Sequence, residues 1–305
     1  MGETKQKKHV YGLLGRNISY SLSPLMHNAA FGHFGISAEY RIFDIDQSLV
    51  IDFLNGISAG DISGMNVTVP YKVTACDFIS GNKSNHVEEL ALRVGAINTI
   101  KVDAGCLEGF NTDGEGFLES LKEDLKLDYG DIAGRDILML GSGGAARALS
   151  FQLLASDFRP AKIILYDTVP ERADSLVSGL EADFGPGSAV SAGAREVHDA
   201  AKVCALIINA TPLGTDENDP MPLDPAKVGS TSAALYDLVY ARTTELQLEW
   251  KKKRLPVCGG LGMLVNQAAL AFRIWNGEGY PRGEVMSAMR SALPEKMRER
   301  YGWNI

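Results

Sequence analysis

The residues that decide the fold are DILMLGSGGAARALSFQLLAS, positions 136–156. The stretch opens with consecutive apolar residues, which are typical of a parallel strand covered on both faces, and continues into a helical pattern. Between the two, Gly141, Gly143 and Ala146 form a G-x-G-x-x-A pattern. A strand, a glycine loop and a helix in this order predict a doubly wound domain that binds a dinucleotide pyrophosphate at the helix N-terminus.

Each small residue of this loop has a physical role in that interpretation. Gly141 permits the tight turn, and Gly143 lacks a side chain that would keep backbone N–H groups away from a pyrophosphate. Ala146 lets the helix and the strand pack closely, and Gly144 and Ala145 complete the predicted cofactor loop. Glycine-rich turns also occur for structural reasons, so the loop alone leaves both interpretations open.

The next strand-like run, KIILYD at 162–167, gives the loop its context because it ends in an acidic residue. Asp167 stands about where a carboxylate that grips a ribose is expected. The alternative is that Asp167 caps the following helix, although Thr168 and Pro170 lie closer to that helix start. We therefore predict a dinucleotide contact for Asp167.

The same rhythm of short apolar runs and helical patterns extends over both halves of the chain. With 305 residues and 45% hydrophobic content, the chain is long enough for two domains. We predict an α/β protein with an N-terminal α/β substrate-binding and catalytic domain over 1–113. A helix near 284–305 returns to it, with a break at Pro294, and 114–283 form a doubly wound Rossmann domain.

Composition excludes several classes of partner. The 30 Lys plus Arg against 38 Asp plus Glu give a net charge of −8 without a basic stripe, which argues against nucleic acid. The basic run 251–254 fits the solvated last turn of a helix. The four cysteines and the histidines lack metal-ligand spacing, so we predict no metal. No signal peptide or long apolar span is present, which predicts a cytoplasmic protein without membrane contact. The sequence does not fix the oligomeric state, and a monomer and a homodimer both stay open.

Four segments of the first domain resemble the shikimate/quinate dehydrogenase family when they are taken together. They are SLSP at 21–24, NVTVPYK at 66–72, GAINTI at 95–100 and NTDGEG at 111–116. The glycine loop and three later segments extend the resemblance over nearly the whole chain: NATPLG at 209–214, DLVY at 237–240 and GGLGMLVNQAA at 259–269. The resemblance implies an enzyme that interconverts a ring alcohol and a ketone with a nicotinamide cofactor, in a cleft between two domains.

By this resemblance Lys72 is the catalytic lysine and Asp113 is its partner. Hydride transfer to a ketone builds alkoxide character on the oxygen, and a positioned donor must neutralise it. Lys72 fits that donor for reduction and, when neutral, the acceptor for oxidation. The alternatives are a solvated surface lysine and, for Asp113, the N-cap of a helix beginning near Gly114.

The resemblance also supplies the substrate contacts. Ser21 and Ser23 precede a helix that starts with Pro24, so two hydroxyls and the helix N-terminus suit a carboxylate, although Ser23 equally fits a simple N-cap. The other family positions on the substrate side are Asn66, Thr68, Asn98, Tyr240 and Gln267. Neutral amides and hydroxyls suit ring hydroxyls, but asparagines also stabilise loops.

On the cofactor side the resemblance assigns Thr211, Gly260 and Met263, although ordinary core packing explains Met263 as well. The chain departs from the family pattern in one place. Many members carry Asn-Arg-Thr where this chain has Tyr166-Asp167-Thr168. A carboxylate there accepts hydrogen bonds from the ribose of NAD and repels the 2′-phosphate of NADP, so we predict NAD, with NADP as the alternative because Arg172 lies nearby.

Two other functions remain to be weighed. A methylene-tetrahydrofolate dehydrogenase type has a related architecture, but the SLSP and NTDG segments argue against it. A sensor of the same fold without turnover is disfavoured because both Lys72 and Asp113 are retained. The sequence does not choose between shikimate and quinate, which differ by one ring hydroxyl.

Overall fold

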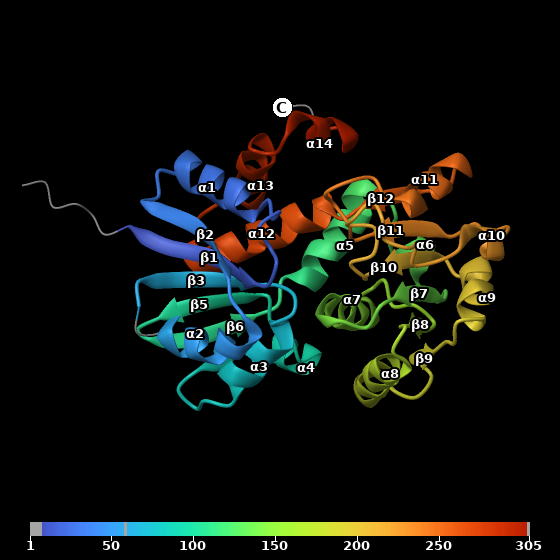
Figure 1. The fold of residues 1–305 in the computed structure, drawn as a ribbon, viewed down its shortest axis with the longest axis horizontal. Coiled ribbons are helices and arrows are strands. Elements are labelled where there is room, and N and C mark those ends of the chain that lie inside the picture. Colours follow the sequence, from blue (N-terminus) through green and yellow to red (C-terminus); the bar gives the residue numbers. More distant parts are fainter. Residues whose placement is uncertain (1–7, 58–59, 304–305) are drawn as a thin grey trace, which may run out of the picture. The chain divides into compact units, whose positions relative to one another are not determined.

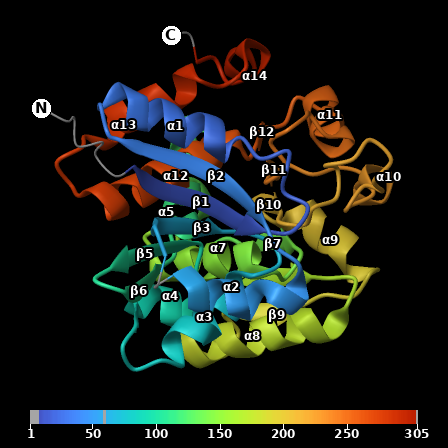
Figure 2. The same ribbon diagram turned by 60° about the vertical axis from the view of Figure 1, so that its left-hand side comes forward.

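The protein is described by a computed structural model over residues 8–57 and 60–303, which form two compact units (Figures 1 and 2). Unit 1 contains the described residues up to Thr112 together with 265–303, and unit 2 is Asp113–Leu264. Each unit is built on one six-stranded sheet. The predicted α/β class is therefore confirmed.

Unit 1 has a mixed sheet of strand order β2-β1-β3-β5-β6-β4. The strands are β1 (His9–Gly15), β2 (Ala38–Asp44), β3 (Ile62–Val67), β4 (His86–Val87), β5 (Thr99–Asp103) and β6 (Cys106–Phe110). Strand β1 pairs in parallel with both β2 and β3, while β5 is antiparallel to β3 and β6. The carboxyl ends of β1, β2 and β3 consequently meet at one edge.

The helices of unit 1 cover both faces of this sheet. They are α1 (Ser23–His33), α2 (Val50–Ile57), α3 (Lys72–Ser80), α4 (Glu89–Val94), α12 (Leu261–Asn276), α13 (Arg282–Ser291) and α14 (Glu295–Arg300), with a 3-10 turn η1 (Gln47–Leu49). Figures 1 and 2 show α1 and α13 on one face and α2 and α3 on the other. Leu14 of β1 packs with the α2–α3 layer, whereas Tyr11 contacts Phe31 of α1, as alternation along a strand requires.

The chain returns to unit 1 at Val265, inside α12, and not near residue 284 as predicted. The second half of α12 explains this correction. The Phe272 ring lies 5.4 Å from that of Phe31, and Trp275 Nε1 donates a hydrogen bond to the Ile100 carbonyl at 2.9 Å. A continuous helical pattern in the sequence does not reveal where such contacts change. The predicted break at Pro294 is confirmed, because α14 begins directly after it.

Unit 2 has an all-parallel sheet of strand order β12-β11-β10-β7-β8-β9, which confirms the predicted doubly wound fold. Its strands are β7 (Ile137–Leu140), β8 (Ile163–Tyr166), β9 (Ala189–Ser191), β10 (Leu206–Asn209), β11 (Ala234–Asp237) and β12 (Val257–Gly259). The strand order reverses between β7 and β10, and ligands of such folds bind beyond the carboxyl ends of the strands at that point.

Seven helices lie within the described part of unit 2 between Asp113 and β12, two of them before the first strand of its sheet. They are α5 (Asp113–Asp124), α6 (Tyr129–Ile132), α7 (Gly144–Ala155), α8 (Pro170–Phe184), α9 (Glu196–Val203), α10 (Pro225–Val228) and α11 (Glu245–Lys252). The basic run 251–254 is exposed at the end of α11, as predicted. Among the residues that the structure describes, none of the helices is long and apolar enough to span a bilayer.

Candidate active site

The glycine loop lies between β7 and α7, at the carboxyl edge of the unit 2 sheet. Gly141 has a φ of +94°, and a Cβ atom placed on it would lie 3.0 Å from Thr211 Cγ2. A side chain is therefore disfavoured both by conformation and by space. Gly143 precedes α7 as its N-cap residue with open space around it, and Ala146 is fully buried.

This geometry suits a dinucleotide. The N-terminus of α7 is free of bulky side chains, because Gly143, Gly144 and Ala145 stand there in sequence. Backbone N–H groups at such an end attract a pyrophosphate. The predicted strand, turn and helix are confirmed, and the loop fits the predicted cofactor.

Asp167 directly follows β8 and joins the glycine loop to the start of α8. Its Oδ2 accepts hydrogen bonds from Ser142 N at 3.0 Å and Ser142 Oγ at 2.6 Å, while Oδ1 accepts one from Val169 N at 2.9 Å. Val169 is the N-cap residue, and Pro170 begins the helix. The side chain that accepts a hydrogen bond from this end of α8 is thus Asp167, and not Thr168 as the sequence suggested. Arg172 is exposed in the first turn of α8.

Two further segments of unit 2 carry predicted cofactor residues. Thr211 lies just after β10, where the Asn209 Oδ1 accepts hydrogen bonds from its N at 3.1 Å and its Oγ1 at 2.7 Å. Gly260 follows β12, and a Cβ atom on it would lie 2.1 Å from the Leu238 carbonyl oxygen, so a side chain cannot fit. Met263 is buried, which agrees with its alternative role in packing. Tyr240 lies three residues after β11.

On the unit 1 side, Ser21 and Ser23 lie side by side at the start of α1. Ser21 Oγ donates to Ser23 Oγ at 3.2 Å and accepts from Ser23 N at 3.2 Å. The N-cap residue is Leu22, which makes no side-chain cap, and Ser23 is the first helical residue. The interpretation of Ser23 as an N-cap is therefore wrong, and the paired hydroxyls fit the predicted carboxylate contact.

The structure brings three predicted amides of unit 1 together. Asn66 Nδ2 donates to the Asn98 carbonyl at 3.2 Å, and Asn98 Nδ2 lies 3.4 Å from Gln267 Oε1. Two residues outside the predicted set complete the cluster. Tyr40 donates from its hydroxyl to Asn66 Oδ1 at 2.8 Å, and Thr112 N donates to Asn98 Oδ1 at 2.9 Å. The side-chain amides of Asn66 and Asn98 are thereby fixed in orientation.

Lys72 is the first residue of α3, and the preceding residues hold it there. Its carbonyl accepts a hydrogen bond from Ile97 N at 3.0 Å, and the Tyr71 hydroxyl donates to the Ile45 carbonyl at 2.6 Å. Thr68 directly follows β3, and its N donates to the Leu14 carbonyl. Asp113 opens α5 in unit 2, so its pairing with Lys72 stays a prediction.

Comparison with known proteins links these residues to a family. The model of the shikimate dehydrogenase substrate binding domain matches residues 13–100, and that of the shikimate 5′-dehydrogenase C-terminal domain matches 260–290. A shikimate dehydrogenase (NADP(+)) of Methanothrix thermoacetophila is 35% identical over 285 residues, which cover 93% of this chain and 97% of the relative. The chain belongs to the shikimate dehydrogenase family.

Solved structures of shikimate dehydrogenases share this fold. The enzyme of Thermus thermophilus, in complex with NADP(H) and shikimate, gives a TM-score of 0.75 at 31% identity and covers 93% of this chain and 100% of its own. The enzyme of Listeria monocytogenes, in complex with shikimate and NAD, gives 0.78 at 27% identity, with 93% and 97% covered. Structures of this family therefore hold shikimate with either dinucleotide.

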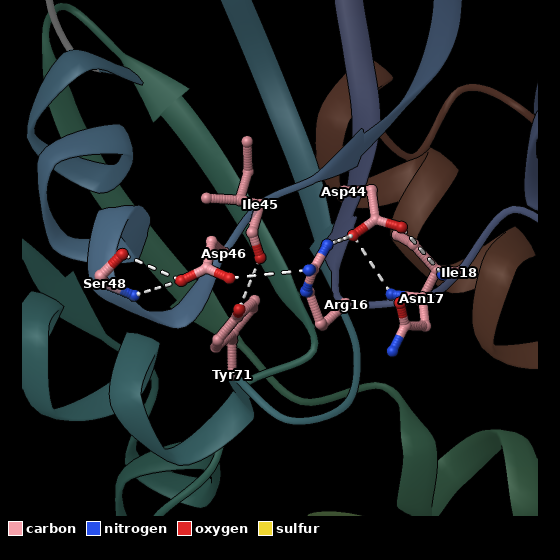
Figure 3. Close-up of polar contacts among 8 residues, drawn as sticks. All are labelled: Arg16, Asn17, Ile18, Asp44, Ile45, Asp46, Ser48 and Tyr71. Atoms are coloured by element: carbon pink, nitrogen blue, oxygen red, sulfur yellow. Dashed lines mark hydrogen bonds and ion pairs between the residues drawn. The ribbon is translucent and has the colours of Figure 1, made fainter.

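Within the region that matches the substrate binding domain, a charged cluster around Asp44 supports the loop at 16–18 (Figure 3). Asp44, the last residue of β2, accepts hydrogen bonds from Arg16 Nη1 at 2.9 Å, Asn17 N at 3.1 Å and Ile18 N at 3.4 Å. The hydrogen bond from Arg16 is the main reason why the pKa of Asp44 is lowered. The cluster fixes the loop that leads to Ser21, and it joins residues 16–18 to Asp44 across more than twenty positions, so no local sequence motif marks it.

His27 of α1 is a buried polar residue beside the amide cluster. Its ring stacks on that of Tyr40, with centroids 4.4 Å apart, and its two nitrogens have no hydrogen-bond partner among the described residues. Burial lowers the pKa of His27 to about 3, against a smaller opposing effect of Asn66. His27 is therefore neutral at physiological pH. The described residues contain no group of three or more His, Cys, Asp or Glu that could hold a metal.

Proposed function

We propose that the protein catalyses the reversible oxidation of shikimate to 3-dehydroshikimate, a step in the formation of aromatic amino-acid precursors. Unit 1 holds the ring acid and unit 2 holds the nicotinamide dinucleotide. The observation that carries this proposal is the similarity over 93% of the chain to a shikimate dehydrogenase. The serine pair in unit 1 and the open glycine loop in unit 2 support the division of roles.

The chemistry follows from the residue types. When bound, the nicotinamide ring supplies the acceptor for the hydride that leaves the carbinol carbon. The neutral amine of Lys72 accepts the hydroxyl proton as the ketone forms, and the ammonium returns it in the reverse direction. Asp113 holds the ammonium in place. Ser21 and Ser23 donate hydrogen bonds to the carboxylate, and Asn66 and the residues around it bind the hydroxyls that do not react.

We further propose NAD as the preferred dinucleotide, although the Methanothrix relative is named for NADP(+). Asp167 supports this choice, because a 2′-phosphate beside its carboxylate would set two negative charges together. The two hydrogen bonds from Ser142 and the one from Val169 hold that carboxylate at the edge of the glycine loop. The NAD complex of the Listeria enzyme is a precedent within the family.

The test is a set of initial rates with shikimate and quinate, each against NAD and NADP. We expect shikimate to be oxidised, and we expect kcat/KM to favour NAD by about a hundredfold. Asp167→Asn should narrow that ratio, whereas Asp174→Asn, which changes an exposed carboxylate on the following helix α8, should not. Equal or better turnover with NADP would show that Asp167 does not face the ribose. Turnover of quinate alone would reassign the substrate.

A further inference from the structure

Asp237, the last residue of β11, is a fully buried carboxylate with four hydrogen-bond donors around it. Its Oδ1 accepts from Asn209 Nδ2 at 2.9 Å and Val239 N at 3.2 Å. Its Oδ2 accepts from Thr244 Oγ1 at 2.6 Å and Gln247 Nε2 at 3.2 Å. None of these four partners is a cation. Burying a carboxylate lowers the stability of the fold unless its oxygens accept hydrogen bonds. The four donors around Asp237 are therefore required wherever this carboxylate is buried in unit 2.

Asp237 sets the orientation of Asn209 on the neighbouring strand. The two residues are register partners of β10 and β11. An ionised carboxylate only accepts hydrogen bonds, so the Asn209 side chain must turn its nitrogen toward Asp237 and its oxygen away. That oxygen then accepts from both Thr211 N and Thr211 Oγ1. The position of Thr211 therefore depends on a carboxylate that it does not touch.

The same carboxylate anchors the chain that follows β11. The hydrogen bond from Val239 N to Asp237 holds the first turn of this segment, and Thr244 fixes its end, where α11 begins. Tyr240 lies in this segment. Within the segment, the Leu238 carbonyl lies against Gly260 so closely that no side chain fits at 260. The Asp237 carboxylate thus supports two stretches that carry predicted cofactor residues, those at Thr211 and Gly260.

We propose that Asp237 is a positioning residue for the nicotinamide end of the cofactor site: through Asn209 it places Thr211, and through the 238–244 segment it supports Gly260. The inference rests on the proposed function, which makes Thr211 and Gly260 cofactor contacts. Asp237 itself touches neither cofactor nor substrate. Burial is the main reason why the pKa of Asp237 is raised, and the four hydrogen bonds partly oppose that rise.

The test is Asp237→Asn, read by the dissociation constants of NADH and NADPH from their fluorescence, and that of shikimate from calorimetry. An amide offers one acceptor oxygen in place of two, so two of the four donors lose their partner. We expect the Kd of the dinucleotide to rise at least about tenfold. The Kd of shikimate should rise less than that of the dinucleotide, because among its proposed contacts only Tyr240 lies in the 238–244 segment and the others lie in unit 1.

A double-mutant cycle with Thr211→Val separates positioning from general destabilisation. If Asp237 acts through Thr211, then Asp237→Asn should have a much smaller effect on dinucleotide Kd in the Thr211→Val background. The control is Trp250→Phe, which removes the buried hydrogen bond from Trp250 Nε1 to Ala233 O at the opposite end of β11. It should lower the melting temperature without changing the dinucleotide Kd.

An unchanged Kd in Asp237→Asn or an equal loss in Trp250→Phe would overturn the proposal, and additive effects in the cycle would overturn the relay from Asp237 through Asn209 to Thr211. Should Asp237→Asn not fold, Asn209→Ala interrupts the same relay, and the same cycle with Thr211→Val decides. These readouts need no turnover. A wild-type protein that binds NADH but does not oxidise shikimate would therefore contradict the proposed function and leave the role of Asp237 open to this test.

Discussion

The two units build their parts of the site in different ways. In unit 2 the predicted cofactor residues stand in short stretches directly after β7, β8, β10 and β12, along one edge of a single parallel sheet. In unit 1 the amides Asn66, Asn98 and Gln267 come from β3, from the turn before β5 and from α12. Each stretch of the cofactor side can be recognised from its own consecutive residues. The amide cluster of unit 1 forms only when distant segments come together in the folded chain.

The largest expected effect concerns the chemistry that we assign to unit 1. Lys72→Ala removes the proton donor and acceptor, so kcat should fall by at least roughly a hundredfold with little change in substrate binding. Lys83→Ala, an exposed lysine between α3 and β4, is the matched control and should keep wild-type rates. A kcat within a few-fold of wild type together with a raised KM would make Lys72 a binding residue.

The same contrast explains which features of the fold and the site could be predicted from the sequence. The glycine loop and the parallel sheet were predictable, because a strand, a turn and a helix in sequence contain their own signal. The contributions of Tyr40 and Thr112 were not, since each becomes part of the amide cluster through a pairing of distant segments. The return at Val265 was missed for the same reason: the helical period of α12 continues unchanged while its neighbours change.

A second prediction tests the buried layer of unit 1 through pH. Folded His27 has a pKa of about 3, whereas an unfolded histidine has one near 6.5, so between these values the unfolded chain binds more protons. Stability of unit 1 should therefore fall as the pH drops below about 6.5, by about 1.4 kcal/mol for each pH unit in that window. Hydrogen exchange of the backbone amides in α1 and β2, followed as a function of pH, measures this free energy of opening.

The matched variants for that experiment are His27→Leu and His86→Leu. The first removes the buried ring and should flatten the dependence of opening free energy on pH, while the second changes an exposed histidine of β4 and should leave the slope as it is. If both variants keep the wild-type slope, protonation of His27 does not govern the acid stability of unit 1.

A third prediction sharpens the division of binding between the units. Ser21→Ala together with Ser23→Ala removes two hydroxyl donors from the proposed carboxylate site, and hydrogen bonds to a charged group are the stronger kind. We expect the KM for shikimate to rise at least about tenfold, with dinucleotide affinity nearly unchanged. A folded double variant with an unchanged KM would remove these serines from the site.

The smallest effect is expected where a residue supports the site from outside it. Asp44→Ala releases Arg16 and two backbone N–H groups from the loop that leads to Ser21. Because the ion pair is partly exposed, we expect only an increase of about two- to fivefold in the KM for shikimate, with kcat preserved. Glu108→Ala, which breaks a comparable partly exposed pair between Glu108 of β6 and Lys101 of β5, should change neither constant. If Asp44→Ala and Glu108→Ala give the same KM for shikimate, Asp44 does not position the loop that leads to Ser21.

The transfer of a hydride from shikimate to the nicotinamide ring can be tested directly with an isotope label. Shikimate that carries deuterium on the carbinol carbon of the reacting hydroxyl is incubated with wild-type protein and NAD, and the products are examined by NMR. We expect reduced dinucleotide with deuterium on the nicotinamide ring, one equivalent for each 3-dehydroshikimate formed. Deuterium that remains on the ring acid after prolonged incubation with NAD or with NADP would contradict it.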